Sequence, residues 1–275
     1  MNGELPLVMP APTRPPLRYY GGKWRIAPWI ISFIPQHDCW VEVFGGAGGV
    51  TLRKPRSKIE VWNDLDNQVF NFYRVLRNPE QLAQLVRGVD LTPFSRAEFE
   101  LSFEQTNDPV EAARRFCVRT QFGHGTASID PRDANGFRSG DFKAGKSYAR
   151  EWAGIPEAIV VAANRMQGVT IENLDYRKLI PKFDHPKAVM YVDPPYPMST
   201  RTAGGKGYVH ELSDEQHREL HWMLSRLKAK VLVSGYECRL YGELYRDWYR
   251  AEKQTTASGQ LGAVPRTEVL WRNYE

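Results

Sequence analysis

A short apolar segment that runs directly into a cluster of glycines constrains the fold of this chain most strongly. Residues 40–44 predict a β-strand, and the sequence Gly-Gly-Ala-Gly-Gly follows at 45–49. A second apolar segment, 59–62, predicts another strand, which ends in Asn63 and Asp64. This spacing is typical of the βαβ unit, in which helices cover the faces of a parallel sheet. We therefore expect an α/β fold whose ligands bind at the carboxyl ends of the strands.

The α/β pattern stops in the middle of the chain and then resumes. Helices are predicted first at 24–34 and 69–76, and then at 96–103 and 110–118, before a segment rich in Gly, Ser, Asp and Arg at 121–145. After it come predicted strands at 169–174, 188–192, 230–234 and 267–273, with a helix at 213–227. We therefore expect a catalytic domain of residues 1–68 and 158–275, in which residues 1–16 form a flexible arm. Residues 69–157 would be an inserted domain, mostly helical, that could include a β-hairpin.

The charge of the chain is concentrated in this middle segment. The formal net charge is +5 and the pI about 9.0. Between Arg114 and Arg150, eight Lys and Arg residues stand against three Asp residues, an excess equal to that of the whole chain. Such an excess favours a polyanionic partner for the inserted segment.

Cysteine usage and hydropathy exclude other classes of protein. The three cysteines lie far apart, which fits neither a disulfide framework nor a zinc site. No apolar run reaches the roughly 18 residues that a membrane helix needs. We expect a cytoplasmic protein that does not associate with a membrane, and nothing in the sequence indicates an obligate protein partner.

The glycine cluster predicts a site where a ligand meets the backbone. Glycines at the end of a strand leave no side chains in the way of such a ligand. Asp64, at the end of the next predicted strand, could accept hydrogen bonds from ribose hydroxyls. A pattern GxxxxGK[ST] is absent, so a P-loop is not expected. A tight strand-to-helix turn with no ligand is the alternative interpretation.

The sequence Asp193-Pro194-Pro195-Tyr196 directly follows an apolar strand. Two prolines remove two backbone donors and leave an acceptor-rich segment, formed by the Asp193 carboxylate and the Pro194 carbonyl. An exocyclic amine offers two N–H donors and needs two such acceptors, and Tyr196 offers a face on which a planar base can stack. The alternative is a proline turn with one aromatic residue packed on the core.

Together these segments resemble the Dam-type, D12-class family of N6-adenine-specific DNA methyltransferases. Its FxGxG cofactor loop corresponds to Phe44-Gly45-Gly46-Ala47-Gly48, and its DPPY loop to Asp193-Pro194-Pro195-Tyr196. Further resemblances lie at 19–23, 63–66, 173–176 and 266–274. The order of cofactor loop, inserted domain and catalytic loop is similar to that of the α group of amino-methyltransferases.

This resemblance implies a Rossmann-like S-adenosylmethionine-dependent sheet with helices on both faces, and methylation of adenine N6 in double-stranded DNA. The base would be flipped out of the helix, S-adenosylhomocysteine would be the product, and no metal would be required. The protein would be of bacterial or phage type and associated with the nucleoid through DNA. The implied catalytic residues are Asp193, Pro194, Pro195 and Tyr196. The implied cofactor contacts are Tyr19, Lys23, Phe44, Gly45, Gly46, Ala47, Gly48, Asp64, Asp175, Tyr176 and Asp193.

The middle segment departs from the family members that recognise GATC. Only residues 119–122 resemble the start of their recognition element, so the GATC site is not carried over. Candidates for base or phosphate contacts are Arg119, His124, Arg132 and Arg138. The alternative for each is a solvated charged loop.

Other functions remain open at this point. A methyltransferase that acts on RNA or on a protein glutamine also uses a similar loop, and a cytosine-N4 DNA methyltransferase is the closest alternative in chemistry. A non-catalytic DNA-binding module would have no use for Asp193 or the glycine loop. The sequence is equally compatible with a restriction-modification, a housekeeping or a phage role.

Overall fold

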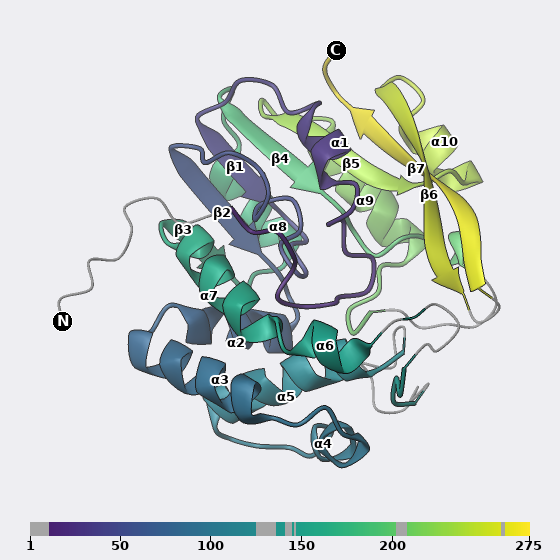
Figure 1. Cartoon of the computed structure of the whole chain (residues 1–275). Coiled ribbons are helices and arrows are strands. Elements are labelled where there is room, and N and C mark those ends of the chain that lie inside the picture. Colours follow the sequence, from purple (N-terminus) through teal and green to yellow (C-terminus); the bar gives the residue numbers. More distant parts are fainter. Residues whose placement is uncertain (1–10, 125–135, 141–144, 146, 202–207, 260–261) are drawn as a thin grey trace. The chain divides into compact units, whose positions relative to one another are not determined.

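The computed structural model describes residues 11–124, 136–140, 145, 147–201, 208–259 and 262–275. The chain forms two compact units (Figure 1). Unit 1 comprises residues 1–27, 49–54 and 71–168, and unit 2 comprises residues 28–48, 55–70 and 169–275. Residues 71–157 of the segment expected as an insertion thus lie in unit 1. This unit also includes residues 158–168 and two segments from the N-terminal part of the chain.

Unit 2 contains a seven-stranded sheet in the order β3-β2-β1-β4-β5-β7-β6. Strands β1 to β5 are parallel, whereas β7 is antiparallel to both β5 and β6. The sheet and the helices around it establish the α/β class. The strands are β1 (Cys39–Glu42), β2 (Ile59–Asn63), β3 (Val169–Glu172), β4 (Ala188–Val192), β5 (Lys230–Tyr236), β6 (Tyr249–Gly259) and β7 (Gly262–Arg272).

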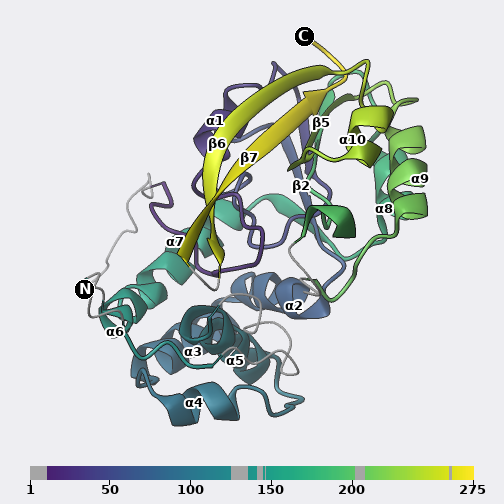
Figure 2. The same cartoon turned by 90° about the vertical axis from the view of Figure 1, so that its right-hand side faces the viewer.

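The two faces of this sheet are covered differently. Val41, Met190 and Val231 belong to a core that also contains residues of α8 (Tyr176–Leu179), α9 (Asp214–Leu224) and α10 (Arg239–Leu244). Both views show these three helices on one side of the sheet and α1 (Ala27–Ile31) on the other (Figures 1 and 2). On the α1 side, Trp40 of β1 stacks on Tyr191 of β4 at 6.1 Å. Strand β4 is buried along its whole length, which explains why its sequence is continuously apolar.

Helix α9 begins where the sequence offers a complete capping box. The Ser213 hydroxyl accepts the Gln216 backbone N–H, and the Gln216 side chain accepts the Ser213 backbone N–H. This exchange satisfies two backbone donors at the helix start. The 3₁₀ helices η3 (Ile180–Phe183) and η4 (Met198–Thr200) complete unit 2.

Strand β6 was not anticipated from the sequence, and the last strand is longer than the expected 267–273. Residues 249–259 are mostly polar and lack the apolar alternation that marks a half-buried strand. They form a strand because β7 pairs with them along their whole length, from Tyr249 opposite Arg272 to Gly259 opposite Gly262.

Unit 1 is helical in its described part. Its helices are α3 (Pro79–Leu91), α4 (Arg96–Leu101), α5 (Pro109–Phe122), α6 (Tyr148–Trp152) and α7 (Ile155–Met166). Helix α2 (Asn67–Leu76) begins in unit 2 and ends in unit 1. Asn78, Ser95 and Asp108 cap α3, α4 and α5, and proline opens α3 and α5. Between residues 69 and 157, the described part contains no paired strands, so the hairpin expected in this segment stays a prediction. An isolated antiparallel bridge links Gly123 and Phe137.

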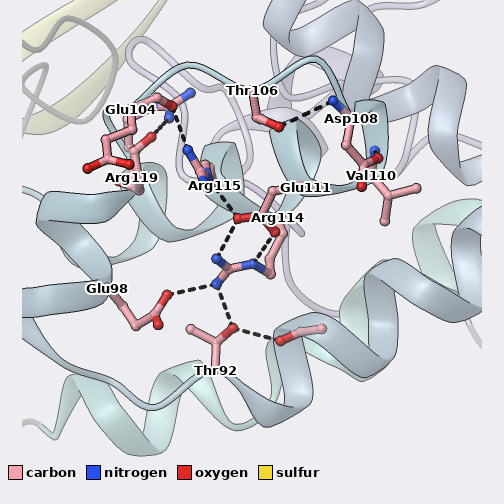
Figure 3. Close-up of polar contacts among 12 residues, drawn as sticks. Thr92, Glu98, Glu104, Thr106, Asp108, Val110, Glu111, Arg114, Arg115 and Arg119 are labelled. Atoms are coloured by element: carbon pink, nitrogen blue, oxygen red, sulfur yellow. Dashed lines mark hydrogen bonds and ion pairs between the residues drawn. The ribbon is translucent and has the colours of Figure 1, made fainter.

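An ion-pair network joins three helices of unit 1 (Figure 3). Arg114 of α5 bonds to Glu111 on its own helix at 2.7 Å and to Glu98 of α4 at 2.9 Å. It also donates to the Thr92 hydroxyl, at the end of α3, at 2.9 Å. Arg115 shares Glu111 and donates to the Glu104 carbonyl. Two of the arginines that make the middle segment basic are therefore neutralised inside the unit.

No helix among the described residues is long and apolar enough to cross a membrane.

Candidate active site

The order of the parallel strands brings the predicted site segments together at one edge of the unit 2 sheet. Strand β1 lies between β2 and β4. Its last residue, Glu42, pairs with Trp62 of β2 and with Tyr191 of β4. The glycine loop, Asp64 and Asp193 therefore leave the sheet from three adjacent strands, at their carboxyl ends. Glu172 of β3 pairs with Asn63 of β2, so the segment that leads to Asp175 leaves next to Asp64.

The glycine loop is shaped by close packing on the neighbouring strand. A Cβ atom on Gly45 would lie 2.1 Å from Nε1 of the buried Trp62 side chain. Gly46 and Gly48 have φ angles of 48° and 66°, which disfavour other residues. Gly48 donates its N–H to the Gly45 carbonyl at 2.7 Å, and Ala47 is buried. The loop thus turns tightly and leaves little side-chain bulk at the end of β1.

Asp64 organises this loop directly. Its Oδ2 atom accepts the Gly46 N–H at 2.7 Å, and its Oδ1 atom accepts the Asp66 N–H at 2.8 Å. Burial raises the pKa of the Asp64 carboxyl to about 6, although the two backbone hydrogen bonds oppose this shift. Each carboxylate oxygen has a second lone pair, so Asp64 can accept further hydrogen bonds from a ligand.

Asn63 is a site residue that was not assigned a role from the sequence. Its side-chain amide donates to the Val43 carbonyl at 2.8 Å and to the Leu174 carbonyl at 3.0 Å. Its Oδ1 atom accepts the Leu174 N–H at 2.8 Å. Asn63 therefore ties the ends of β1 and β3 to β2. The sequence signal for such a role was the position of Asn63 at the end of a predicted strand, next to Asp64.

Two predicted cofactor residues, Phe44 and Tyr176, lie against each other. Their ring centroids are 5.8 Å apart, and the Tyr176 hydroxyl donates to Glu219 at 3.2 Å. Asp175 caps α8 by accepting the Arg177 N–H at 2.8 Å, and it forms an ion pair with the Arg177 guanidinium at 3.1 Å. Asp175 thus has the capping role that a residue at a strand end can take.

Tyr19 and Lys23 belong to unit 1 and form a tight turn there. Gly22 donates its N–H to the Tyr19 carbonyl at 3.1 Å, and Gly21 has a φ angle of 69°. The buried Lys23 side chain donates to the Gly21 carbonyl at 2.7 Å. A Cβ atom on Gly49 would lie 3.4 Å from the Lys23 backbone nitrogen. Within unit 1, this turn therefore packs on the residue that follows the glycine loop.

Asp193 is held from the neighbouring strand β5. The Ser234 hydroxyl donates to Asp193 Oδ1 at 3.1 Å and lies 2.6 Å from the Tyr191 hydroxyl. Burial, and then the negative charge of Asp193, raise the pKa of Tyr191 well above its usual value. Tyr191 therefore stays protonated, and the Ser234 hydroxyl is the donor to the carboxylate.

Tyr196 is buried, and its hydroxyl is engaged in a hydrogen bond. The side chain is 8% exposed, and its hydroxyl donates to the Glu268 carboxylate. Burial and the negative charges of Asp193 and Glu268 raise the pKa of Tyr196 well above its usual value. The phenol is therefore neutral, and its proton is committed to Glu268. Pro194 and Pro195, which precede it, are buried.

An arginine beyond the Asp193–Tyr196 segment was also not assigned from the sequence. Arg201 donates to the Tyr196 carbonyl at 2.8 Å and forms a bidentate ion pair with Glu211, with both distances 2.6 Å. Glu211 also accepts the Tyr208 N–H at 3.0 Å. Bidentate Arg–carboxylate pairs fix geometry as well as charge. This pair therefore anchors the chain that leaves Tyr196.

The four DNA-contact candidates fall into different environments. Arg119 is 9% exposed, donates to the Ser102 carbonyl and lies over the rings of Phe103 and Phe116. Arg138 is 7% exposed and lies 3.5 Å over the Tyr148 ring. Both side chains are thus engaged in packing within unit 1. His124 is exposed, and Arg132 lies outside the described residues.

Comparison with known proteins identifies the family of this chain. Residues 19–258 match the family described as D12 class N6 adenine-specific DNA methyltransferase. The DNA adenine methylase of Escherichia coli (strain K12) is 25% identical over 248 residues, which cover 86% of this chain and 84% of the relative.

Two further relatives carry the same name. The DNA adenine methylase of Serratia marcescens is 25% identical over 245 residues, which cover 85% of this chain and 86% of the relative. The DNA adenine methylase of Vibrio cholerae serotype O1 (strain ATCC 39541 / Classical Ogawa 395 / O395) is 23% identical over 268 residues. These cover 94% of this chain and 90% of the relative. Together with the glycine loop and the Asp193–Tyr196 segment on adjacent strands, these matches favour adenine in DNA over RNA, protein glutamine or cytosine. The chain belongs to the D12 class of N6-adenine-specific DNA methyltransferases.

Proposed function

We propose that unit 2 binds S-adenosylmethionine beside the glycine loop and transfers its methyl group to an adenine that has been extruded from double-stranded DNA. The observation that carries this proposal is the adjacency of β2, β1 and β4. It places Asp64, the glycine loop and Asp193 at neighbouring strand ends.

The residues at this edge fit the chemical groups of the proposed cofactor. Asp64 can accept hydrogen bonds from ribose hydroxyls. The rings of Phe44 and Tyr176 lie against each other, and an adenine ring would pack beside them. The loop formed by Gly45, Gly46, Ala47 and Gly48 allows a ligand to approach the backbone. Asp175 would contact the adenine amine in addition to capping α8. By family resemblance, we assign further cofactor contacts to Tyr19 and Lys23.

The cofactor supplies an electrophilic methyl group on a sulfonium. Asp193 and the Pro194 carbonyl would accept the two hydrogens of adenine N6 and so favour a nitrogen whose lone pair is free to attack. The Asp193 carboxylate stabilises the positive charge that develops on N6, which is the kind of preorganised electrostatic effect that dominates many enzymes. Asp193 orients the amine and need not remove its proton first. The sulfonium leaves as a neutral thioether, the methylated N6 then readily loses one proton to solvent, and this chemistry requires no metal.

Tyr196 would stack on the extruded base. Extrusion costs a few kcal/mol, and stacking of a base on an aromatic ring can offset about 1–3 kcal/mol. Pro195 removes a further backbone donor, so the acceptors dominate this part of the site. Unit 1 would recognise the DNA sequence. Its candidates for DNA contacts stay Arg119, His124, Arg132 and Arg138, and His124 is exposed.

The test is methyl transfer by the wild type and by Asp193→Ala and Asp193→Asn. Labelled S-adenosylmethionine would be supplied with unmethylated duplex DNA, total RNA or protein, and methylation-aware sequencing would locate the modified base. We expect label on adenine in duplex DNA alone. Asp193→Ala should lower the rate by at least 10²–10³-fold, as for loss of a preorganised catalytic contact. Retention of more than a tenth of the wild-type rate by Asp193→Ala, with cofactor saturating, would refute the role of Asp193.

A further inference from the structure

One face of strands β5 and β7 carries side chains that hold both ends of the Asp193–Tyr196 segment. Ser234 and Tyr236 are two residues apart on β5 and therefore project on the same face. Glu268 of β7 pairs directly with Tyr236, and residues opposite each other in an antiparallel pair also share a face. Ser234 contacts Asp193, whereas Tyr236 and Glu268 both contact Tyr196.

Tyr196 is fixed at two points by this cross-strand pair. Its hydroxyl donates to Glu268 Oε1, and its ring lies edge-to-face with the Tyr236 ring, at a centroid distance of 4.9 Å and an angle of 75°. A hydrogen bond at the far end of the phenol and a perpendicular ring at its side together limit rotation of the side chain. The orientation of the ring is therefore set by two paired strands.

The direction of the hydrogen bond follows from the chemistry of the two groups. An ionised carboxylate only accepts, and the neutral Tyr196 phenol can donate. Glu268 is 3% exposed, and a buried carboxylate is costly unless it is hydrogen-bonded. Hydrogen bonds to an ionised acceptor are about twice as strong as those between neutral groups. A buried glutamate at this position is therefore strongly coupled to a neutral tyrosine.

We propose that Glu268 is a positioning residue for methyl transfer. It holds the Tyr196 ring in the orientation in which an extruded adenine stacks on it. This role rests on the stacking function proposed for Tyr196. Glu268 acts through Tyr196 and does not itself touch the base, so an uncharged side chain that still offers an acceptor oxygen should retain most of the effect.

The experiment compares four variants with the wild-type full-length protein: Glu268→Gln, Glu268→Leu, Tyr196→Phe and the double variant Tyr196→Phe/Glu268→Leu. The first keeps an acceptor oxygen without the charge, the second removes the acceptor, and the third removes the donor but keeps the ring. Single-turnover methylation would be measured on a duplex that contains the site found by sequencing. Fluorescence of 2-aminopurine at the target position would report base extrusion, and cofactor affinity would be measured separately.

We expect Glu268→Leu and Tyr196→Phe each to lower the single-turnover rate and the extrusion signal. The rate should fall by roughly 10- to 100-fold, as for the loss of one hydrogen bond to a buried charged group. The double variant should lose no more than either single variant, Glu268→Gln should stay within about fivefold of the wild type, and cofactor affinity should not change. A multiplicative loss in the double variant would overturn the proposal, and so would a loss in Glu268→Gln equal to that in Glu268→Leu.

Two controls separate the possible causes of failure. Glu60 is a buried glutamate near the start of β2, where it accepts the Ser57 N–H at 3.2 Å. Glu60→Leu should retain the wild-type rate, and a loss there equal to that in Glu268→Leu would mean that removal of a buried carboxylate destabilises the protein in general. Tyr196→Ala tests the stacking role itself. Wild-type activity of Tyr196→Ala would refute that role, whereas an impaired Tyr196→Ala beside a fully active Glu268→Leu would refute only the role of Glu268.

Discussion

Ser234 and Asp193, which are far apart in the sequence, are joined by a hydrogen bond of 3.1 Å from the serine hydroxyl to the Oδ1 atom of the aspartate. The same hydroxyl lies 2.6 Å from that of Tyr191, the residue two positions before Asp193. Strands β4 and β5 are adjacent and parallel, so the end of β4 before the Asp193–Tyr196 segment is oriented by its neighbour. The carboxylate on which the proposed chemistry depends is thus held by a buried serine.

The first prediction concerns this serine. Ser234→Ala should lower the methylation rate by roughly tenfold or more, because a hydrogen bond to a charged group typically contributes about 1.5–3 kcal/mol. Cofactor affinity should stay near that of the wild type. Tyr191→Phe is the companion variant, since it removes a partner of Ser234 without touching Asp193, and it should have a smaller effect. A wild-type rate for Ser234→Ala would mean that Asp193 is oriented by its other contacts.

The second prediction concerns Asp64 and pH. Asp64→Ala should weaken S-adenosylmethionine binding by about 1.5–3 kcal/mol, measured by calorimetry. Since burial raises the pKa of Asp64 to about 6, cofactor affinity should fall as the pH is lowered through this value, because the protonated carboxyl is a weaker acceptor. The free energy of unfolding depends on the protonation of Asp64 in the opposite direction to the cofactor affinity. A raised pKa means that this group contributes less to the free energy of unfolding as the pH rises from about 4 to 6. Asp64→Asn should bind more weakly and without this pH dependence. An unchanged dissociation constant in Asp64→Ala would leave Asp64 with a structural role, as the anchor of the Gly46 and Asp66 backbone.

The third prediction tests the close approach at Gly45. Gly45→Ala would place a Cβ atom 2.1 Å from Trp62 Nε1, so the buried indole or the glycine loop must move. Such overpacking typically costs about 1–3 kcal/mol in the free energy of unfolding, and a displaced loop should also weaken cofactor binding. Gly242→Ala in α10 is the matched control, because its Cβ would meet only the flexible Glu237 side chain, at 3.1 Å. It should be neutral or stabilising, since alanine is the better helix former. Equal stability of Gly45→Ala and the wild type would show that the loop adapts without cost.

The fourth prediction is an acid sensitivity that arises at His217. This side chain is 1% exposed, its Nδ1 atom lies 3.2 Å from the Tyr241 hydroxyl, and burial lowers its pKa to about 4. The negative charges of Asp214 and Glu211 oppose this shift of the pKa, and the positive charge of Arg201 adds to it. A lowered pKa contributes stability that is fully present above about pH 6.5 and is lost as the pH falls towards 4.

This loss should amount to roughly 3 kcal/mol at pH 4, because a tenfold change in proton affinity corresponds to about 1.4 kcal/mol. Denaturant unfolding between pH 7.5 and 4.5 would measure most of it. His217→Gln should flatten the dependence, whereas the same change at the exposed His210 should not. Parallel pH profiles for the wild type and His217→Gln would contradict the assignment.

The fifth prediction separates buried from exposed arginines in unit 1. Arg119→Ala and Arg138→Ala should lower the free energy of unfolding, because each removes a buried side chain that packs on aromatic rings. Arg150 is exposed, and Arg150→Ala should leave stability unchanged. If unit 1 meets the phosphates through Arg150, that variant should also reduce the salt dependence of DNA binding by about one unit of slope. Normal stability with a reduced salt slope in Arg119→Ala would instead place this side chain on DNA.

Local sequence determined the parts of this protein that depend on neighbouring residues. Apolar runs long enough for buried strands, glycines that permit positive φ angles at 46 and 48, and two prolines before Tyr196 each act within a few residues. The fold class and the family followed from these segments. The Ser213 capping box defined the start of α9 in the same way.

The tertiary structure decided which side chains are available for function, because burial and partner choice depend on residues that are far apart in the chain. Arg119 and Arg138 counted as positive charges in the sequence, yet packing on Phe103 and Tyr148 buries them. Strand β6 has no apolar pattern of its own and exists through its pairing with β7. Glu268 looked like one acidic residue in a terminal strand. It meets Tyr196 because β7 pairs with β5 in the register that sets Glu268 opposite Tyr236.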